Sequence, residues 1–415
     1  MATDLAGVAP PVPVRNRRRT ALAMAGPAFV AAVAYIDPGN VATNITAGAK
    51  YGYLLLWVVV LANAMAMLIQ YMSAKLGIAT GRNLPELCRE RYSRPVRLGL
   101  WAQAELVIIM TDLAEIVGGA VALNLLFGLP LVTGGVLTGL GLLAILSLRV
   151  RGHDGFAPVV VGLLGIVFAA FVYQVLRLPV AHEGFAAGLV PGFGDDGSIL
   201  LAAGIVGATV MPHAIYLHSA LTQDIPDASP ERSRRRALRV TRWDVIVAMS
   251  LAGVVNIAIM VAGTALPMAA GESLATAYAS FRSVAGQFTG VVFGVALLAS
   301  GLASSCVGVF TGQIVMQGFL RRGIPLSVRR GVSMLPPLAL LAFGMDPTLA
   351  LVLSQVALSF GIPFALVPLI LLTRREDVMG SLVNARRTTV LAVAAATLII
   401  VLNGYLLAVA FGVVR

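Results

Sequence analysis

The sequence contains little charge for its length. Only 12% of its 415 residues are Asp, Glu, Lys or Arg, whereas 58% are hydrophobic, and the mean hydropathy is +0.90. A water-soluble domain of this size carries about twice that share of charged residues. The scarcity of charge therefore excludes a soluble protein and predicts an all-α polytopic membrane protein.

Cysteine and histidine are also scarce, with two and four residues. Cys88 and Cys306 are not spaced for a disulfide framework or a cysteine-based metal site. His182 and Glu183 lack the second histidine that a helical zinc-protease motif requires, and no phosphate-binding loop is present. The sequence therefore excludes an intramembrane metalloprotease and a built-in ATPase, and it predicts neither enzyme activity nor a bound cofactor.

The N-terminal residues lack a long apolar stretch. Residues 1–14 are rich in Pro, Val and Ala, which differs from the apolar core of a signal peptide. We expect residues 1–20 to form a disordered cytoplasmic tail and residues 21–415 to form a single transmembrane domain.

Apolar runs fill most of the remaining chain. A helix needs about 20 apolar residues to cross the hydrocarbon core of a membrane. The stretch 284–320 exceeds one crossing, so we expect that helix to continue beyond the membrane. We expect eleven spans, near residues 21–49, 53–77, 98–126, 130–148, 156–178, 199–222, 243–268, 284–320, 330–345, 346–373 and 388–413.

The basic residues are distributed unequally between the loops that eleven spans create. Of the 30 Lys and Arg, 26 fall on one side, and only Lys50, Arg177, Arg282 and Arg415 fall on the other. Because basic loops remain cytoplasmic, we expect a multi-pass protein of the cell inner membrane with its N-terminus inside and its C-terminus outside. Contact with a membrane then accounts for the net charge of +11 without a nucleic-acid partner.

Two spans contain matching helix breakers. The first has DPGN at Asp37–Asn40 in its middle, and the sixth has MPH at Met211–His213. Proline removes a backbone donor and glycine lowers helix propensity, so both sequences predict an interrupted helix. Unpaired backbone groups persist in a membrane only where they line a cavity or bind an ion.

The spacing of the two breaks predicts an inverted repeat. The second unit starts five spans after the first, and because five is an odd number, the second unit is inserted upside down relative to the first. This pattern is typical of the LeuT-like transporter architecture. We expect repeat one at about 21–178, repeat two at about 199–373 and an extra helix at about 388–413; two unrelated proline kinks are the alternative.

The residues at the breaks form a candidate metal site. Asp37 offers an anionic oxygen, Asn40 an amide oxygen and Met211 a thioether. The broken turns also free the carbonyls of Ala34 and Ala208. Oxygen ligands alone suit Mg²⁺ or Ca²⁺, whereas a thioether favours softer metals. The mixed set predicts a site for Mn²⁺, Fe²⁺, Co²⁺ or Cd²⁺; a methionine that only fills the core is the alternative.

Acidic residues inside an apolar segment form a second candidate group. Glu105, Asp112 and Glu115 lie within about 80° of one another on one helix, over about 15 Å. A charge at mid-bilayer costs about 2.5–3.5 kcal/mol, so we expect these three side chains to face a polar interior. An acidic stripe of this kind is suited to carrying protons, although an ion pair that only holds helices together is the alternative.

Three further residues extend this proton hypothesis. An unperturbed histidine titrates near neutral pH, so His213 can exchange protons. Arg329 and Arg330 open the ninth span and are placed to pair with the acidic stripe; ordinary anchoring at the cytoplasmic surface is the alternative for both. We interpret His218 as an interior histidine with a satisfied hydrogen bond.

The two break motifs, in eleven spans, resemble the Nramp (natural resistance-associated macrophage protein) family over about residues 20–413. The resemblance looks closest to the bacterial manganese-uptake branch. It implies proton-coupled import of Mn²⁺ or Fe²⁺, and of Cd²⁺ and Co²⁺. It further implies that Asp37, Asn40 and Met211 bind metal through their side chains, and that Ala34 and Ala208 do so through their carbonyls.

The resemblance also assigns residues outside the two breaks. It implies that Gln355, in the tenth span, approaches the metal in some conformations. Gly361 stands where many relatives have a second glutamine, which bears on fine selectivity. The residues that match a polar network linked to proton movement are His213, Asp112, Glu115, Glu105, Arg329 and Arg330.

Two other classes of transporter remain as alternatives. An amino-acid or sodium symporter of the same architecture binds its substrate carboxylate at helix N-termini, and Asp37 would repel that carboxylate. A Mg²⁺-transporting relative should lack Met211. We expect the partners to be the metal ion, protons and membrane lipid, with no obligatory protein partner and a monomeric state.

Overall fold

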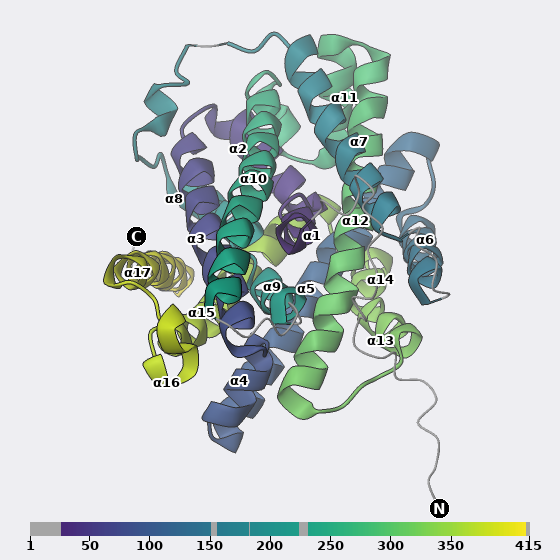
Figure 1. The fold of residues 1–415 in the computed structure, drawn as a ribbon. Helices are drawn as coiled ribbons and strands as arrows, with labels where there is room; N and C mark the ends of the chain where they lie inside the picture. Colours follow the sequence, from purple (N-terminus) through teal and green to yellow (C-terminus); the bar gives the residue numbers. More distant parts are fainter. Residues whose placement is uncertain (1–25, 151–155, 182, 224–230, 412–415) are drawn as a thin grey trace, which may run out of the picture.

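The computed structural model describes residues 26–150, 156–181, 183–223 and 231–411, and in these residues the regular structure is entirely helical (Figure 1). Eight helical segments in this part of the chain are long and apolar enough to cross a membrane, with the pair α8 and α9 counted as one. The prediction of an all-α membrane protein is therefore confirmed. These segments are α3 (Leu56–Thr80), α5 (Arg94–Phe127), α7 (Phe156–Arg177), α8 (Asp196–Thr209) with α9 (Pro212–Gln223), α10 (Glu231–Thr264), α12 (Gln287–Leu320), α15 (Pro347–Thr373) and α17 (Arg386–Ala410).

The three remaining predicted spans are helical but shorter. The described part of the span 21–49 forms α1 (Pro27–Ala34) and α2 (Pro38–Tyr51), whereas residues 21–25 lie outside the described residues. Residues 130–148 correspond to α6 (Leu131–Val150). The span predicted at 330–345 is instead two helices, α13 (Leu326–Ser333) and α14 (Leu335–Ala342), each about 12 Å long. Pro336 has no N–H to bond the carbonyl four residues earlier, which explains the interruption. The number of eleven spans thus stays a prediction.

Several short helices were not predicted, because the sequence was searched for long apolar runs. They are α4 (Leu84–Arg91), α11 (Leu274–Ala285), α16 (Glu376–Met379) and the 3₁₀ turns η2 (Ala187–Leu189), η3 (Met268–Gly271) and η4 (Gly380–Leu382). The starts of α4 and α11 do carry a local signal, since Asn83 and Ser273 form capping boxes with residues three positions on. The tail predicted at 1–20 lies outside the described residues.

The bundle has two distinguishable ends. In Figure 1, α4, α13 and α16 lie at the bottom of the view, whereas α11 and one end of α7 lie at the top. We call these the α4 end and the α11 end. At 34 residues, α5, α10 and α12 are each about 51 Å long. They therefore exceed the thickness of the hydrocarbon core, as expected from the sequence for 284–320.

The broken helices occupy the interior of the bundle. In the apolar window of α8 and α9, 89% of residues are buried, compared with 28% in α17 and 33% in α7. Helix α15 packs against α5 and α8, and α12 packs against α5 and α7. The helix breaks and the acidic stripe on α5 are thus enclosed by other helices, and α17 lies at the edge of the bundle in Figure 1.

Candidate functional site

The first predicted break is confirmed, because α1 ends at Ala34 and α2 begins at Pro38. Asp37 caps α2: its fully buried carboxylate accepts hydrogen bonds from the backbone N–H groups of Asn40 (2.9 Å) and Gly39 (3.3 Å). Pro38 lies at the first helical position, where a missing N–H costs nothing. The anionic group is therefore fixed at the positive end of α2.

The second predicted break is also confirmed and lies against the first. Helix α8 ends at Thr209 and α9 begins at Pro212, with the fully buried Met211 between them. The Nδ2 of Asn40 donates a hydrogen bond to the carbonyl of Ala208, at 3.1 Å. Residues far apart in the sequence thus meet at the two interrupted helices.

The backbone carbonyls that the first break frees are bound by side chains of other helices. The carbonyl of Tyr35 accepts hydrogen bonds from the Nδ2 groups of Asn40 (2.6 Å) and Asn256 (3.2 Å). The carbonyl of Ile36 accepts one from the Ser300 hydroxyl at 2.6 Å. Helices α10 and α12 therefore stabilise the interrupted turn. Without these hydrogen bonds its carbonyls would be unpaired inside the membrane, which is unfavourable.

Gln355 of α15 also reaches the first break. Its Nε2 donates to the Asp37 carboxylate at 3.2 Å, and its Oε1 is buried without a hydrogen-bond partner. A Cβ added at Gly39 would collide with the Gln355 side chain, and one at Gly207 would collide with the Gln355 carbonyl. Glycine at both positions allows α15 to approach the two breaks closely.

The side chains at the two breaks match the set of metal ligands that the sequence predicted for a divalent transition metal. One carboxylate, two amides and one thioether lie at or beside the breaks, and the Asn40 Oδ1 accepts a hydrogen bond from Asn44 at 2.9 Å. Within the described ranges, no cluster of three or more His, Cys, Asp and Glu side chains is placed to hold a metal. An ion bound here would therefore combine hard oxygen ligands with the soft sulfur of Met211.

The acidic stripe on α5 begins with an ion pair near the α4 end. The Arg329 guanidinium donates to both carboxylate oxygens of Glu105, at 2.7 and 3.3 Å. Trp101 donates to the same carboxylate from one turn earlier, at 3.2 Å. The predicted pairing of Arg329 with the stripe is confirmed, although Arg329 lies on the separate helix α13.

The second ion pair lies deeper in the protein. Arg330 donates to Asp112 at 2.5 Å, and only 0% and 4% of the two side chains are exposed. The Nε and one terminal nitrogen of Arg330 are buried without a partner. Because this arginine is enclosed, membrane-surface anchoring does not explain its position.

Glu115 has no arginine partner at hydrogen-bond distance among the residues that the structure describes. Its Oε1 accepts a hydrogen bond from Ser304 at 2.9 Å, and its Oε2 is buried without a partner. Two glycines of α12 provide the space for the stripe: a Cβ at Gly308 would lie 3.1 Å from the Glu115 carboxylate, and one at Gly312 would overlap the Arg329 guanidinium.

His213 connects the second break with the helix that carries the stripe. Its Nδ1 lies 3.3 Å from the hydroxyl of Thr111, the residue next to Asp112. Its Nε2 is buried without a partner. The histidine is thus placed between the candidate metal site and α5.

A buried hydrogen-bond chain that starts at Tyr35 was not predicted from the sequence. The Gln70 amide donates to the Tyr35 hydroxyl at 2.5 Å, and the Gln70 oxygen accepts from the Nδ1 of His218 at 2.8 Å. The interpretation of His218 as an interior histidine fits this contact at Nδ1, whereas its Nε2 is buried without a partner in the described residues. A glutamine, Gln70, within the apolar span predicted at 53–77 was the signal available in the sequence.

Gly361 lies where α15 meets α5 and α9. Its carbonyl accepts a hydrogen bond from Gln103 at 3.3 Å. An added Cβ would meet the side chains of Val107, Gln103 and Pro212. A larger residue here, such as the glutamine that the resemblance leads one to expect, would require the neighbouring side chains to move.

Comparison with known proteins agrees with this arrangement. The natural resistance-associated macrophage protein-like (Nramp) family model matches residues 28–409. The chain is 49% identical to the divalent metal cation transporter MntH of Bacillus subtilis, covering 94% of this chain and 92% of the relative. It is also 49% identical to MntH of Deinococcus radiodurans, covering 94% and 90% of the two chains.

Solved structures give the same result. The manganese transporter of Eremococcus coleocola, in a mutant form, superimposes with a TM-score of 0.81 at 33% identity and covers 94% of this chain and 88% of its own. A nucleobase-cation-symport-1 family transporter, MHP1, has a TM-score of 0.54 at 16% identity and shares the fold alone. The chain therefore belongs to the Nramp family, and it is a divalent metal cation transporter rather than an enzyme.

Proposed function

We propose that the protein is a proton-coupled secondary transporter that imports Mn²⁺ or Fe²⁺, and also Cd²⁺ and Co²⁺, into the cytoplasm. The observation that carries this proposal is the meeting of two interrupted helices around one carboxylate. Asn40 of the first break donates a hydrogen bond to the Ala208 carbonyl of the second, and Gln355 of α15 donates one to the Asp37 carboxylate. The manganese transporter structure supports manganese as the first candidate substrate.

The metal ligands in this proposal are Asp37, Asn40 and Met211 through their side chains, Ala34 and Ala208 through their carbonyls, and Gln355 in some conformations. The C-terminal ends of α1 and α8 carry partial negative charge, which favours a cation. The unpartnered Oε1 of Gln355 is an acceptor that a metal ion would satisfy. The thioether of Met211 would disfavour Ca²⁺ and Mg²⁺ relative to Mn²⁺.

Protons follow a different route in this proposal. A metal ion that binds Asp37 displaces its proton by charge repulsion, and His213 or the carboxylates of Asp112 and Glu115 receive it. Glu105, with Arg329 and Arg330, leads the proton towards the cytoplasm. The support is the series of buried and partly buried polar groups along α5, which is a different helix from those that carry the metal ligands.

The proposed membrane arrangement has eleven spans, two inverted five-helix repeats and one single domain. The α4 end is cytoplasmic, because most Lys and Arg lie in the loops assigned to that side. The N-terminus is then inside and the C-terminus outside, in the cell inner membrane, and the protein acts as a monomer. The position of both breaks in the interior supports the repeat, since broken helices form the binding site in this architecture.

The direct test is uptake of Mn²⁺ by proteoliposomes that contain a pH-sensitive dye. The native protein should accumulate Mn²⁺ and acidify the vesicle interior when the outside is acidic. Asp37→Ala should abolish Mn²⁺ uptake. Asp346→Ala is the matched control, because Asp346 also caps a helix, α15, but is exposed and lies about 13 Å along that helix from Gln355. Uptake by Asp37→Ala that equals the control would refute the proposed site.

A further inference from the structure

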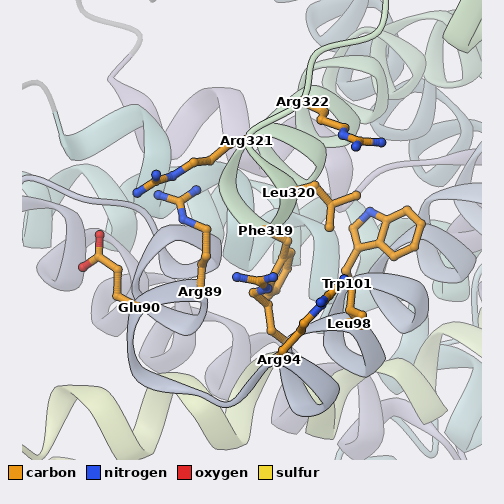
Figure 2. A pocket seen from close by; sticks show the side chains of 10 residues that line it. Arg89, Glu90, Arg94, Leu98, Trp101, Phe319, Leu320, Arg321 and Arg322 are labelled. Carbon is orange, nitrogen blue, oxygen red and sulfur yellow. The ribbon is translucent and has the colours of Figure 1, made fainter.

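A cavity of about 690 Å³ lies at the α4 end, outside the site between the two helix breaks. It forms where α4, the first turns of α5 and the C-terminus of α12 meet (Figure 2). Glu90 is its one acidic lining residue, and its carboxylate already pairs with Arg82. Five arginines line the cavity: Arg89, Arg94, Arg97, Arg321 and Arg322.

The charges of these five arginines are not balanced within the described part of the chain, where none of them pairs with a carboxylate. Arg89 donates to the carbonyls of Gln317 and Gly318, but the Nε groups of Arg89 and Arg97 are buried without a partner. Burial, and then the charge of Arg321, lower the pKa of Arg89. The cavity therefore contains guanidinium groups that lack an anion.

Helix geometry adds to this positive charge. Arg94 and Arg97 lie in the first turn of α5, where the helix N-terminus is itself positive and disfavours cations. Ser93 caps this helix without a side-chain hydrogen bond. Arg321 is the one non-glycine residue of the described chain with positive φ, at 56°, and Figure 2 shows it beside Arg89. An anion in the cavity would be attracted by all of these groups.

An apolar wall lies beside the arginines. Trp101, Phe319 and Leu320 line the cavity, as does Leu98, of which 37% is exposed. Tryptophan is enriched where a membrane meets water, and basic pockets between membrane helices bind the headgroups of anionic lipids. A free phosphate ion would use only the arginines, whereas a phospholipid would also cover the apolar wall.

The geometry points to a binding site for the headgroup of an anionic phospholipid from the membrane leaflet at the α4 end. The arginines hold the phosphate, and the acyl chains pass Leu98 and Trp101. Because α4 and α5 contribute one wall and α12 the other, a bound lipid stabilises the contact between these helices. This site is independent of the metal chemistry between the breaks.

Thermal unfolding of the purified full-length protein in a nonionic detergent tests this proposal. Phosphatidylglycerol should raise the unfolding temperature in a saturable way, whereas phosphatidylcholine and inorganic phosphate should not. Arg94→Gln with Arg97→Gln should weaken the apparent affinity about 30-fold, since each basic residue near an anionic lipid contributes about fivefold. Arg386→Gln with Arg387→Gln is the matched control: it removes two exposed arginines near the same end, at the start of α17, and should leave the affinity unchanged.

A second double variant distinguishes a loss of lipid binding from a loss of folding. Arg321→Gly with Arg322→Gln removes two lining charges but places glycine where φ is positive, so the protein without lipid should be at least as stable. It should also lose most of the effect of phosphatidylglycerol. The proposal is overturned if inorganic phosphate stabilises as much as the lipid, if phosphatidylcholine is equally effective, or if the control variant loses the response to the same extent.

Discussion

The buried ion pair between Asp112 and Arg330 is the interaction whose removal should change stability most. Both side chains are enclosed, and Arg330 keeps two nitrogens without any partner even in the intact pair. Replacing Asp112 with leucine removes the carboxylate that forms the ion pair with this guanidinium. Removing one partner of a buried pair typically costs about 3–5 kcal/mol, because a charge is left uncompensated. We expect Asp112→Leu, and likewise Arg330→Met, to lower the free energy of unfolding by that amount.

The double variant separates this explanation from a simple packing defect. Replacing a whole buried ion pair by apolar residues is often close to neutral. Asp112→Leu with Arg330→Met should therefore lose much less stability than the sum of the single variants. The free energy of unfolding in mixed detergent and SDS micelles provides the measurement. Arg91→Gln is the control, because its pair with Asp377 is exposed and should contribute little.

Two results would refute this reasoning. The first is an Asp112→Leu variant as stable as the Arg91→Gln control, which would mean that the pair is solvated in the membrane-bound protein. The second is a double variant whose loss equals the sum of the two single losses. That result would show that Asp112 and Arg330 contribute independently rather than as a charge pair.

Three further outcomes follow from individual side chains. Met211→Ala should retain Mn²⁺ uptake but allow Ca²⁺ or Mg²⁺ to compete, because the soft ligand is lost; exclusion of both ions as in the native protein would show that the thioether does not set selectivity. Glu115→Gln should preserve Mn²⁺ binding while proton influx falls, measured as Mn²⁺ flux and internal pH in the same vesicles. Strict proportionality between the two fluxes would contradict a separate proton route. Burial raises the pKa of the Cys88 thiol, so its thiolate stays scarce between pH 7 and 9. Maleimide should then label it far more slowly than the exposed position in Ser93→Cys, and equal labelling rates would show that α4 is not packed as described.

Much of the fold could be predicted because the membrane imposes simple rules. Long apolar runs located the eight long segments. The prolines Pro38 and Pro212, together with their neighbours in the two break motifs, located both interruptions within a few residues. The segment 330–345 is two short helices rather than one, because Pro336 interrupts a stretch that hydropathy alone does not divide. The short helices α4 and α11 were missed, since they depend on capping residues rather than on apolar length.

The candidate site was predictable in its composition but not in its connections. Charge in an apolar segment identified Glu105 and Asp112, and the structure confirms their arginine partners. The sequence could not show that Asn40 would donate to Ala208, or that Gln355 would donate to Asp37, because these contacts depend on how distant helices pack. The arginine-lined cavity was likewise hidden, since its walls come from segments more than two hundred residues apart.

Anomalous X-ray diffraction from crystals soaked in Mn²⁺ would show where the metal binds in the bundle. We predict one strong peak between the two helix breaks, bounded by Asp37, Asn40 and Met211, that disappears in Asp37→Ala and persists in Asp346→Ala. A peak at any other place in the bundle, or an undiminished peak in Asp37→Ala, would contradict the claim that the paired breaks form the metal site.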